Sequence, residues 1–131
     1  MSNVKRWLLV LLAVNIGASI LHYADNIVFF HTYPEPHWIN PRIIDAFWLV
    51  MTPFAVSGYV LYGKGLRTYA YLCFYLYSLM SLLVFGHYQY GSMWEMSLKI
   101  NLLIFVEAAV AIALIAYTMW LQFRPRPARK A

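Results

Sequence analysis

Residues 98–121 read LKINLLIFVEAAVAIALIAYTMWL, and this stretch decides the fold class. Between residues 102 and 116 its only polar side chain is Glu107. A helix needs about 20 predominantly apolar residues to cross the hydrocarbon core of a bilayer. The stretch is long enough and apolar enough for that, so it predicts a transmembrane helix that carries one acid in its middle part.

Three further apolar segments precede it, at about residues 7–30, 43–62 and 69–88. They are continuous apolar runs, whereas the strands of a membrane β-barrel alternate apolar and polar residues over about 10 positions. We therefore expect an all-α integral membrane protein, an antiparallel bundle of four transmembrane helices in one domain covering residues 1–123. Lys5 and Arg6 before a leucine-rich stretch also resemble a signal peptide, but no clean small-x-small cleavage site follows them.

The overall composition favours lipid as the solvent. Of the 131 residues, 63% are hydrophobic and 11% are charged, against about 25% charged in a soluble domain. The formal net charge of +5 would suggest nucleic acid as the partner of a soluble protein. Here the basic residues lie between apolar runs and no nucleic-acid-binding motif is present, so the expected partner is the lipid bilayer and not nucleic acid.

The basic residues also predict an orientation. Only Arg42 and Lys99 belong to the side where the second helix begins, and the other eight share the opposite side: Lys5, Arg6, Lys64, Arg67, Arg124, Arg126, Arg129 and Lys130. An excess of Lys and Arg marks the cytoplasmic side. Both termini are therefore expected in the cytoplasm, with residues 124–131 as a basic, disordered tail. The economy of the chain favours a bacterial inner membrane.

Two connections between the segments are informative. Gly63-Lys64-Gly65 predicts a tight turn, which makes the second and third helices antiparallel neighbours. The connection from His31 to Pro41 contains three prolines, which stiffen it and stop the first helix from continuing. Three residues of this connection have two interpretations: His31, Glu35 and His37 are either solvated loop residues or ligands of a metal site.

The ionisable residues other than Lys and Arg gather toward the predicted outer side. This group comprises all four histidines and all five acids: His22, His31, His37, His87, Asp25, Glu35, Asp45, Glu95 and Glu107. At a rise of about 1.5 Å per residue, His22 lies roughly 22 Å from Trp7 along the first helix, and Glu107 lies roughly 20 Å from Trp120 along the fourth. The two side chains are therefore expected at nearly the same depth, within a hydrocarbon core about 30 Å thick.

Helix one carries a polar stripe. Asn15, Ser19, His22 and Asn26 are separated by four, three and four positions, which places them on one helical face. Such a face packs against other helices and not against lipid, because a polar group facing lipid is costly. The stripe either joins the helices by hydrogen bonds or contributes to a functional site.

The leading hypothesis is a metal or haem site in the outer third of the bilayer. Nitrogen and oxygen ligands suit zinc, iron and copper, and the candidate ligands are His22, Asp25, His87 and Glu107, with Asp45 as a weaker member. Alternatively, His22 and His87 hold one haem axially. No pair of these residues has a recognised ligand spacing, so the hypothesis depends on convergence in three dimensions.

Two other hypotheses remain. One is a membrane enzyme that performs acid–base chemistry on a lipid-soluble substrate, with Glu107 as the acid and His22 as the base. The other is an accessory or assembly subunit, either a homo-oligomer or part of a larger membrane complex. Small residues that permit close helix packing favour it: Gly17, Ala18, Ser19, Ala108, Ala109, Ala111 and Ala113. No HExxH, CxxC, GxSxG or P-loop motif is present.

Overall fold

The structure, a computed structural model, describes residues 3–125, so the predicted tail lies outside the described residues from position 126 onward. Within that range the chain is all-helical. Its elements are α1 (Asn3–Val28), the short 3-10 helix η1 (Phe30–Thr32), α2 (Pro41–Gly63), α3 (Arg67–Ser81), the 3-10 helix η2 (Leu82–Gln89) and α4 (Leu98–Phe123). Four spans, counting α3 and η2 together, are long and apolar enough to cross a membrane.

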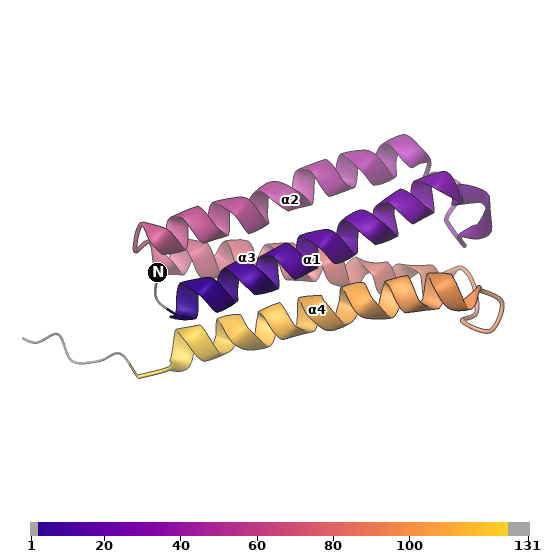
Figure 1. Cartoon of the computed structure of the whole chain (residues 1–131). Helices are drawn as coiled ribbons and strands as arrows, with labels where there is room; N and C mark the ends of the chain where they lie inside the picture. The colour runs from indigo at the N-terminus through magenta and orange to yellow at the C-terminus, as the bar shows by residue number, and fades with distance from the viewer. Residues whose placement is uncertain (1–2, 126–131) are drawn as a thin grey trace, which may run out of the picture.

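The helices form an antiparallel bundle (Figure 1). Each helix packs against its neighbours in the chain, and α4 closes the bundle by packing against α1. Both described chain ends lie at one end of the bundle, which we call the terminal end. The opposite end, which we call the loop end, carries the connection of residues 29–40 and the connection of residues 90–97.

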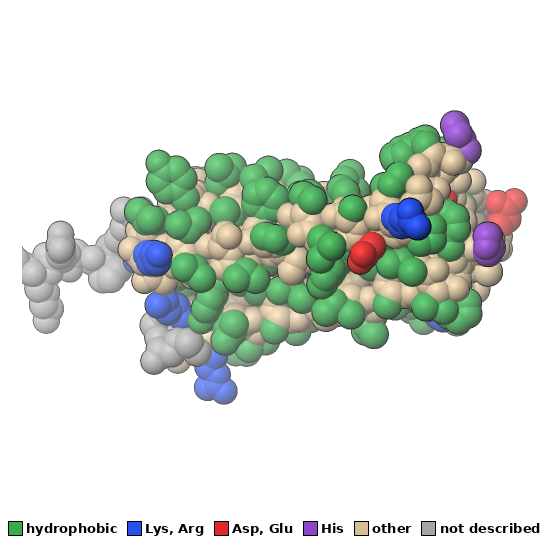
Figure 2. Space-filling view, turned by 90° about the horizontal axis from the view of Figure 1, so that it is seen from above, with side chains coloured by type: hydrophobic (Ala, Val, Ile, Leu, Met, Phe, Trp, Pro, Cys, Tyr) green, Lys and Arg blue, Asp and Glu red, His purple; other side chains and the backbone are tan. Residues whose placement is uncertain are grey.

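The outside of the bundle is apolar along its length. Figure 2 shows hydrophobic side chains over the whole visible face, with Lys and Arg near its two ends and His at the loop end. Large apolar side chains such as Leu21, Leu79 and Leu83 are more than half exposed. An exposed apolar surface of this extent is typical of a protein that contacts lipid or other apolar helices.

The turn between α2 and α3 has the geometry that its glycines predict. Gly65 has a φ of 80°, a left-handed conformation that glycine adopts without steric cost. The Leu66 amide donates to the Leu61 carbonyl at 3.0 Å, which closes the C-terminal end of α2. The tight connection makes α2 and α3 antiparallel neighbours, as predicted.

The terminal half of the bundle has a closely packed apolar interior. Its fully buried side chains come from all four helices and include Leu8, Ala55, Phe74 and Leu114. In a bilayer such packing stabilises the bundle through van der Waals contacts between helices, because lipid chains are themselves apolar. This packing separates the polar residues of the loop half from the terminal end.

Helices α2 and α3 pack tightly at Gly58. A Cβ atom there would lie 2.5 Å from a ring carbon of the buried Phe74 and 3.1 Å from the Cβ of Cys73. We expect Gly58→Ala to lower the free energy of unfolding by about 1 to 3 kcal/mol, because the ring must shift in a packed core. Gly17→Ala is the matched control, because its added Cβ meets no atom within 4 Å and should stabilise the helix by about 0.5 to 1 kcal/mol. Reversible unfolding in mixed micelles measures both, and equal stability of the two variants would contradict this packing.

The polar stripe of α1 faces the interior, as its spacing predicts. Asn15, Ser19, His22 and Asn26 are all at least nine-tenths buried. Asn15 donates to the carbonyl of Val110 on α4 at 2.9 Å, and Ser19 accepts from the indole of Trp48 on α2 at 3.3 Å. The inner part of the stripe therefore joins α1 to two neighbouring helices.

The third span departs from the single helix expected at residues 69–88. Regular α-helix ends at Ser81, and η2 continues as a 3-10 helix to Gln89, longer than the usual three or four residues. Gly86 lies within it, and glycine is a poor α-helix former. Because a 3-10 helix has three residues per turn, Ser81, Val84 and His87 share one face, and all three are buried. In an α-helix, residue 87 would turn away from residue 81.

Candidate functional site

Three helices bring polar side chains together in the loop half of the bundle. The Nδ1 atom of His22 on α1 lies 2.5 Å from Oε2 of Glu107 on α4. The hydroxyl of Ser81 on α3 donates to Oε1 of the same carboxyl group at 2.9 Å. Glu107 is fully buried and His22 is 2% exposed. The equal depth expected for these two residues thus corresponds to direct contact, and Ser81 is a partner that was not among the candidate residues.

The hydrogen-bonding roles of His22 depend on its tautomer, and we take Glu107 as ionised. A carboxylate only accepts hydrogen bonds, so in this state Glu107 takes one from Ser81 and one from Nδ1–H of His22. Donation from Nδ1 leaves Nε2 of the neutral imidazole with a lone pair. Nε2 is buried, and no described residue is its hydrogen-bond partner. His22 is therefore held in one orientation, and its second ring nitrogen is buried without a partner among the described residues.

His22 forms part of the wall of a cavity of about 400 Å³ at the loop end. The cavity lies between α1, α2, η2 and the connection of residues 29–40, and most of its wall is apolar or aromatic: Tyr23, Trp38, Ile39, Ile43, Ile44, Phe47, Leu83, Val84 and Tyr90. Glu107 does not line it. Mostly apolar cavities with a few placed polar groups are the usual form of small-molecule sites.

A second polar group closes the loop end of this cavity. The Asn26 amide donates to Oε1 of Glu35 at 2.8 Å, and Nδ1 of His87 lies 3.3 Å from the same oxygen. The His87 and His22 rings are 5.3 Å apart, edge to face. Glu35 therefore belongs to the cavity wall and is not a freely solvated loop residue. For His87, the signal in the sequence was its distance of six residues from Ser81. Residues six apart share one face of a 3-10 helix but not of an α-helix.

Asp25 lies outside the His22–Glu107 contact. It accepts from the Tyr33 hydroxyl at 2.8 Å and from the Lys99 ammonium at 2.7 Å. The cause is helix geometry: at about 100° per residue, Asp25 and Asn26 lie on opposite sides of the line through His22. Asn26 faces the cavity, and Asp25 faces the start of α4, which carries Lys99.

The other acids and histidines of the expected cluster are dispersed. Asp45 is exposed on α2, next to the buried Ile44, so this weaker candidate is not part of the site. His31 and His37 are also exposed. Of the five candidate ligands, the structure brings together three: His22, His87 and Glu107.

The arrangement does not fit the expected metal or haem. Within residues 3–125, no group of three or more His, Cys, Asp or Glu side chains could hold one ion, and a protein zinc site uses at least three such ligands. A haem with two axial histidines lies between their rings, whereas His22 and His87 contact each other edge to face. Metal binding is therefore not supported.

No protein-family model matches this chain, and no curated protein or solved structure matches it. We therefore infer function from the site itself. An imidazole that is oriented by a buried carboxylate, with its second nitrogen available beside an apolar cavity, can accept a proton and return it.

Glu35 is expected to make stability depend on pH. Burial raises the pKa of Glu35 above its usual 4.5, while the Asn26 amide and nearby His22 act in the opposite direction. Because the folded protein holds this proton more tightly, its stabilising contribution is complete below pH 4.5 and is lost as pH rises through the folded-state pKa. The difference in unfolding free energy between wild type and Glu35→Gln should fall across this window. A pH-independent difference would contradict the buried position of Glu35.

Proposed function

We propose that this chain is a membrane enzyme that transfers a proton on a lipid-soluble substrate. His22 serves as the proton-accepting and proton-donating group, and Glu107 positions it. One observation carries the proposal: His22 lines the cavity, its Nδ1 is held by a buried carboxyl group, and its Nε2 has no partner among the described residues. A histidine that only joined helices would use both nitrogens in contacts with protein.

The proposed reaction needs no group beyond the chain and its substrate. Nε2 of His22 takes a proton from one position of the substrate, and the resulting imidazolium is stabilised by the negative charge of Glu107. While it is on Nε2 the proton exchanges with solvent, and His22 then delivers a proton to another position of the substrate, which gives an isomerisation with no net gain or loss of atoms. Both oxygens of Glu107 are already engaged, so we assign it a positioning role in place of the acid role expected from sequence.

The proposal includes a place in the cell. The apolar surface of all four spans and the basic residues at the terminal end favour insertion in a bilayer with both termini in the cytoplasm. A bacterial inner membrane suits this arrangement. The cavity then belongs to the outer half of the bilayer, where the apolar packing of the terminal half separates it from the cytoplasm.

The orientation can be tested with cysteine labelling. A membrane-impermeant maleimide should label Ser92→Cys in intact cells and leave Lys64→Cys unlabelled until the membrane is opened. Ser92 and Lys64 are both exposed but lie in connections at opposite ends of the bundle. The wild type, with Cys73 as its one cysteine, provides the background. The reverse labelling pattern would place the cavity in the inner half of the bilayer.

The activity is tested by isotope transfer. Membranes that contain the protein are incubated in heavy water, and their lipid extract is compared by mass spectrometry with that of His22→Ala membranes. Proton transfer to carbon leaves deuterium in the product, so at least one lipid species should gain deuterium in the wild type only. His37→Ala is the matched control, because His37 is exposed and does not line the cavity. If no lipid shows labelling that depends on His22, the proposed function is wrong.

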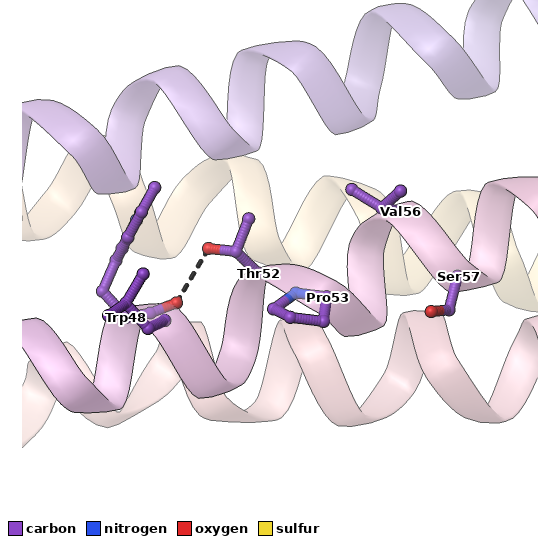
Figure 3. Close-up of a pocket in the computed structure, with 6 residues that line it drawn as sticks. Trp48, Thr52, Pro53, Val56 and Ser57 are labelled. Carbon is purple, nitrogen blue, oxygen red and sulfur yellow. Dashed lines mark hydrogen bonds between the residues drawn. The ribbon is translucent and has the colours of Figure 1, made fainter.

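An accessory subunit is the second candidate, favoured by features of the outer surface. Ala109 and Ala113 on α4 are exposed, and small residues one turn apart permit close packing of a further helix. A hollow of about 360 Å³ lies on α2 beside Pro53, where the Thr52 hydroxyl donates to the Trp48 carbonyl at 2.8 Å (Figure 3). This candidate, a homo-oligomer or a member of a larger complex, predicts that Ala113→Trp abolishes function while His22→Ala preserves it.

A further inference from the structure

The apolar part of the cavity wall continues onto the outside of the bundle. Ile44 and Phe47 of α2 and Val84 of η2 belong to the cavity wall. Two other wall residues, Ile43 and Leu83, are 38% and 63% exposed and belong to the apolar outer surface. A molecule dissolved among lipid chains could therefore pass between α2 and η2 without crossing a polar surface.

Two polar atoms of wall residues have no hydrogen-bond partner among the described residues, and both can accept a hydrogen bond. Asn26 uses its amino group on Glu35, which fixes the orientation of the amide and leaves Oδ1 as its free end. Oδ1 of Asn26 and Nε2 of His22 are both buried without a partner among the described residues. Each of these atoms is an acceptor in the neutral His22 tautomer. A bound molecule satisfies them only if its polar end donates hydrogen bonds.

The charged residues near the cavity also favour a ligand without negative charge. No Lys or Arg lines the cavity, and Glu35 is its one acid. At this end of the bundle, Lys99 is paired with Asp25, and Arg42 is exposed and does not line the cavity. Protonation of His22 creates a positive charge that Glu107 already balances. A carboxylate or phosphate on the ligand would therefore be buried beside Glu35 with no countercharge of its own.

We propose that the cavity takes a lipophilic molecule whose polar end is a hydrogen-bond donor without negative charge, namely a long-chain or cyclic alcohol or amine. The hydroxyl or amino group binds at His22 and Asn26, and the apolar body lies between α2 and η2. This inference rests on the proposed function, because it names the substrate class of the same cavity.

The experiment is photo-cross-linking in lipid nanodiscs. A dodecanol analogue with a diazirine near its hydroxyl group is the labelling probe, and dodecanol, dodecylamine and laurate are the competitors. We expect the probe to label residues 36–47 and 83–90, and dodecanol or dodecylamine to displace it saturably. Laurate should bind at least about tenfold more weakly, because one unpaired buried polar group lowers the binding free energy by that amount. Equal or stronger displacement by laurate overturns the proposed substrate class but leaves the cavity as a binding site.

A pair of glycine variants shows whether the cavity itself is labelled. An added Cβ meets no atom within 4 Å at Gly86, which lines the cavity, or at Gly17, which does not. Gly86→Phe should abolish saturable labelling, and Gly17→Phe should retain it. Without saturable labelling in the wild type, the cavity binds none of these ligands, and both the substrate class and the proposed function are overturned.

Discussion

Replacing Glu107 by leucine is expected to lower the free energy of unfolding by about 1 to 3 kcal/mol, the usual cost of leaving a buried hydrogen-bond donor without its partner. Glu107 is fully buried and accepts from both His22 and Ser81. Leucine would leave Nδ1 of His22 without an acceptor in an apolar interior. The Ser81 hydroxyl loses less, because it can donate to a carbonyl one turn earlier in its own helix.

The double variant separates a broken pair from lost packing. His22→Leu combined with Glu107→Leu removes both polar partners, and replacing a buried pair by apolar side chains is often neutral or stabilising. We therefore expect the double variant to regain most of the stability that Glu107→Leu loses. The measurement is unfolding in mixed micelles, with the exposed Glu95→Gln as a control that should change stability by less than about 0.5 kcal/mol. A double variant as unstable as the single one would show that the contact contributes little.

The second large effect concerns rate. His22→Ala should reduce deuterium incorporation into the lipid product by about 100- to 10,000-fold, the usual contribution of a positioned proton-transfer group. Glu107→Gln should also slow the reaction, because glutamine can orient the imidazole but cannot balance the charge of the imidazolium. Since the two residues act as a unit, the double variant His22→Ala/Glu107→Gln should be no slower than His22→Ala alone.

Non-additivity distinguishes a positioning role from an independent one. If Glu107 acted directly on the substrate, its loss would slow the reaction further in the absence of His22. Initial rates of deuterium incorporation for wild type, both single variants and the double variant provide the comparison. Stability is measured on the same preparations, because loss of folded protein would lower all rates together and would not reproduce the non-additive pattern.

Together these expectations separate stability from function at one contact. The leucine double variant lacks the contact between His22 on α1 and Glu107 on α4. It should nevertheless fold well, and it should be inactive. A polar pair that an apolar pair can replace without loss of stability has another reason to be present. The proposed proton transfer supplies that reason.

Sequence reasoning anticipated the helices and part of the site. Apolar runs located the four spans, and the spacing of Asn15, Ser19, His22 and Asn26 predicted which face of α1 is buried. Depth along the helix axis brought His22 level with Glu107. These predictions succeed because rise and rotation per residue are constant in an α-helix, so position in sequence translates directly into height and face.

Other parts of the site could not be anticipated in this way. Regular helix gives way to 3-10 helix after Ser81, and this change turns His87 toward His22. Glu35 joins the wall because the connection of residues 29–40 folds back over the bundle, where Tyr33 donates to Asp25. The expectation that Asp25 and Asp45 join the same site assumed that residues at equal depth converge, and the rotation of each helix decides that.

The sequence by itself determined that this is a chain of four apolar helical spans with its acids and histidines toward one end. The reason is that hydropathy and helix length act along the chain, within each segment. Only the tertiary structure decided which of those acids and histidines are in contact, that Glu107 contacts Nδ1 of His22, and that Glu35 and Asn26 form part of the cavity wall. Those contacts depend on the rotation of packed helices, on the switch to 3-10 geometry and on the fold-back of one loop, all of which are set by packing between segments distant in sequence.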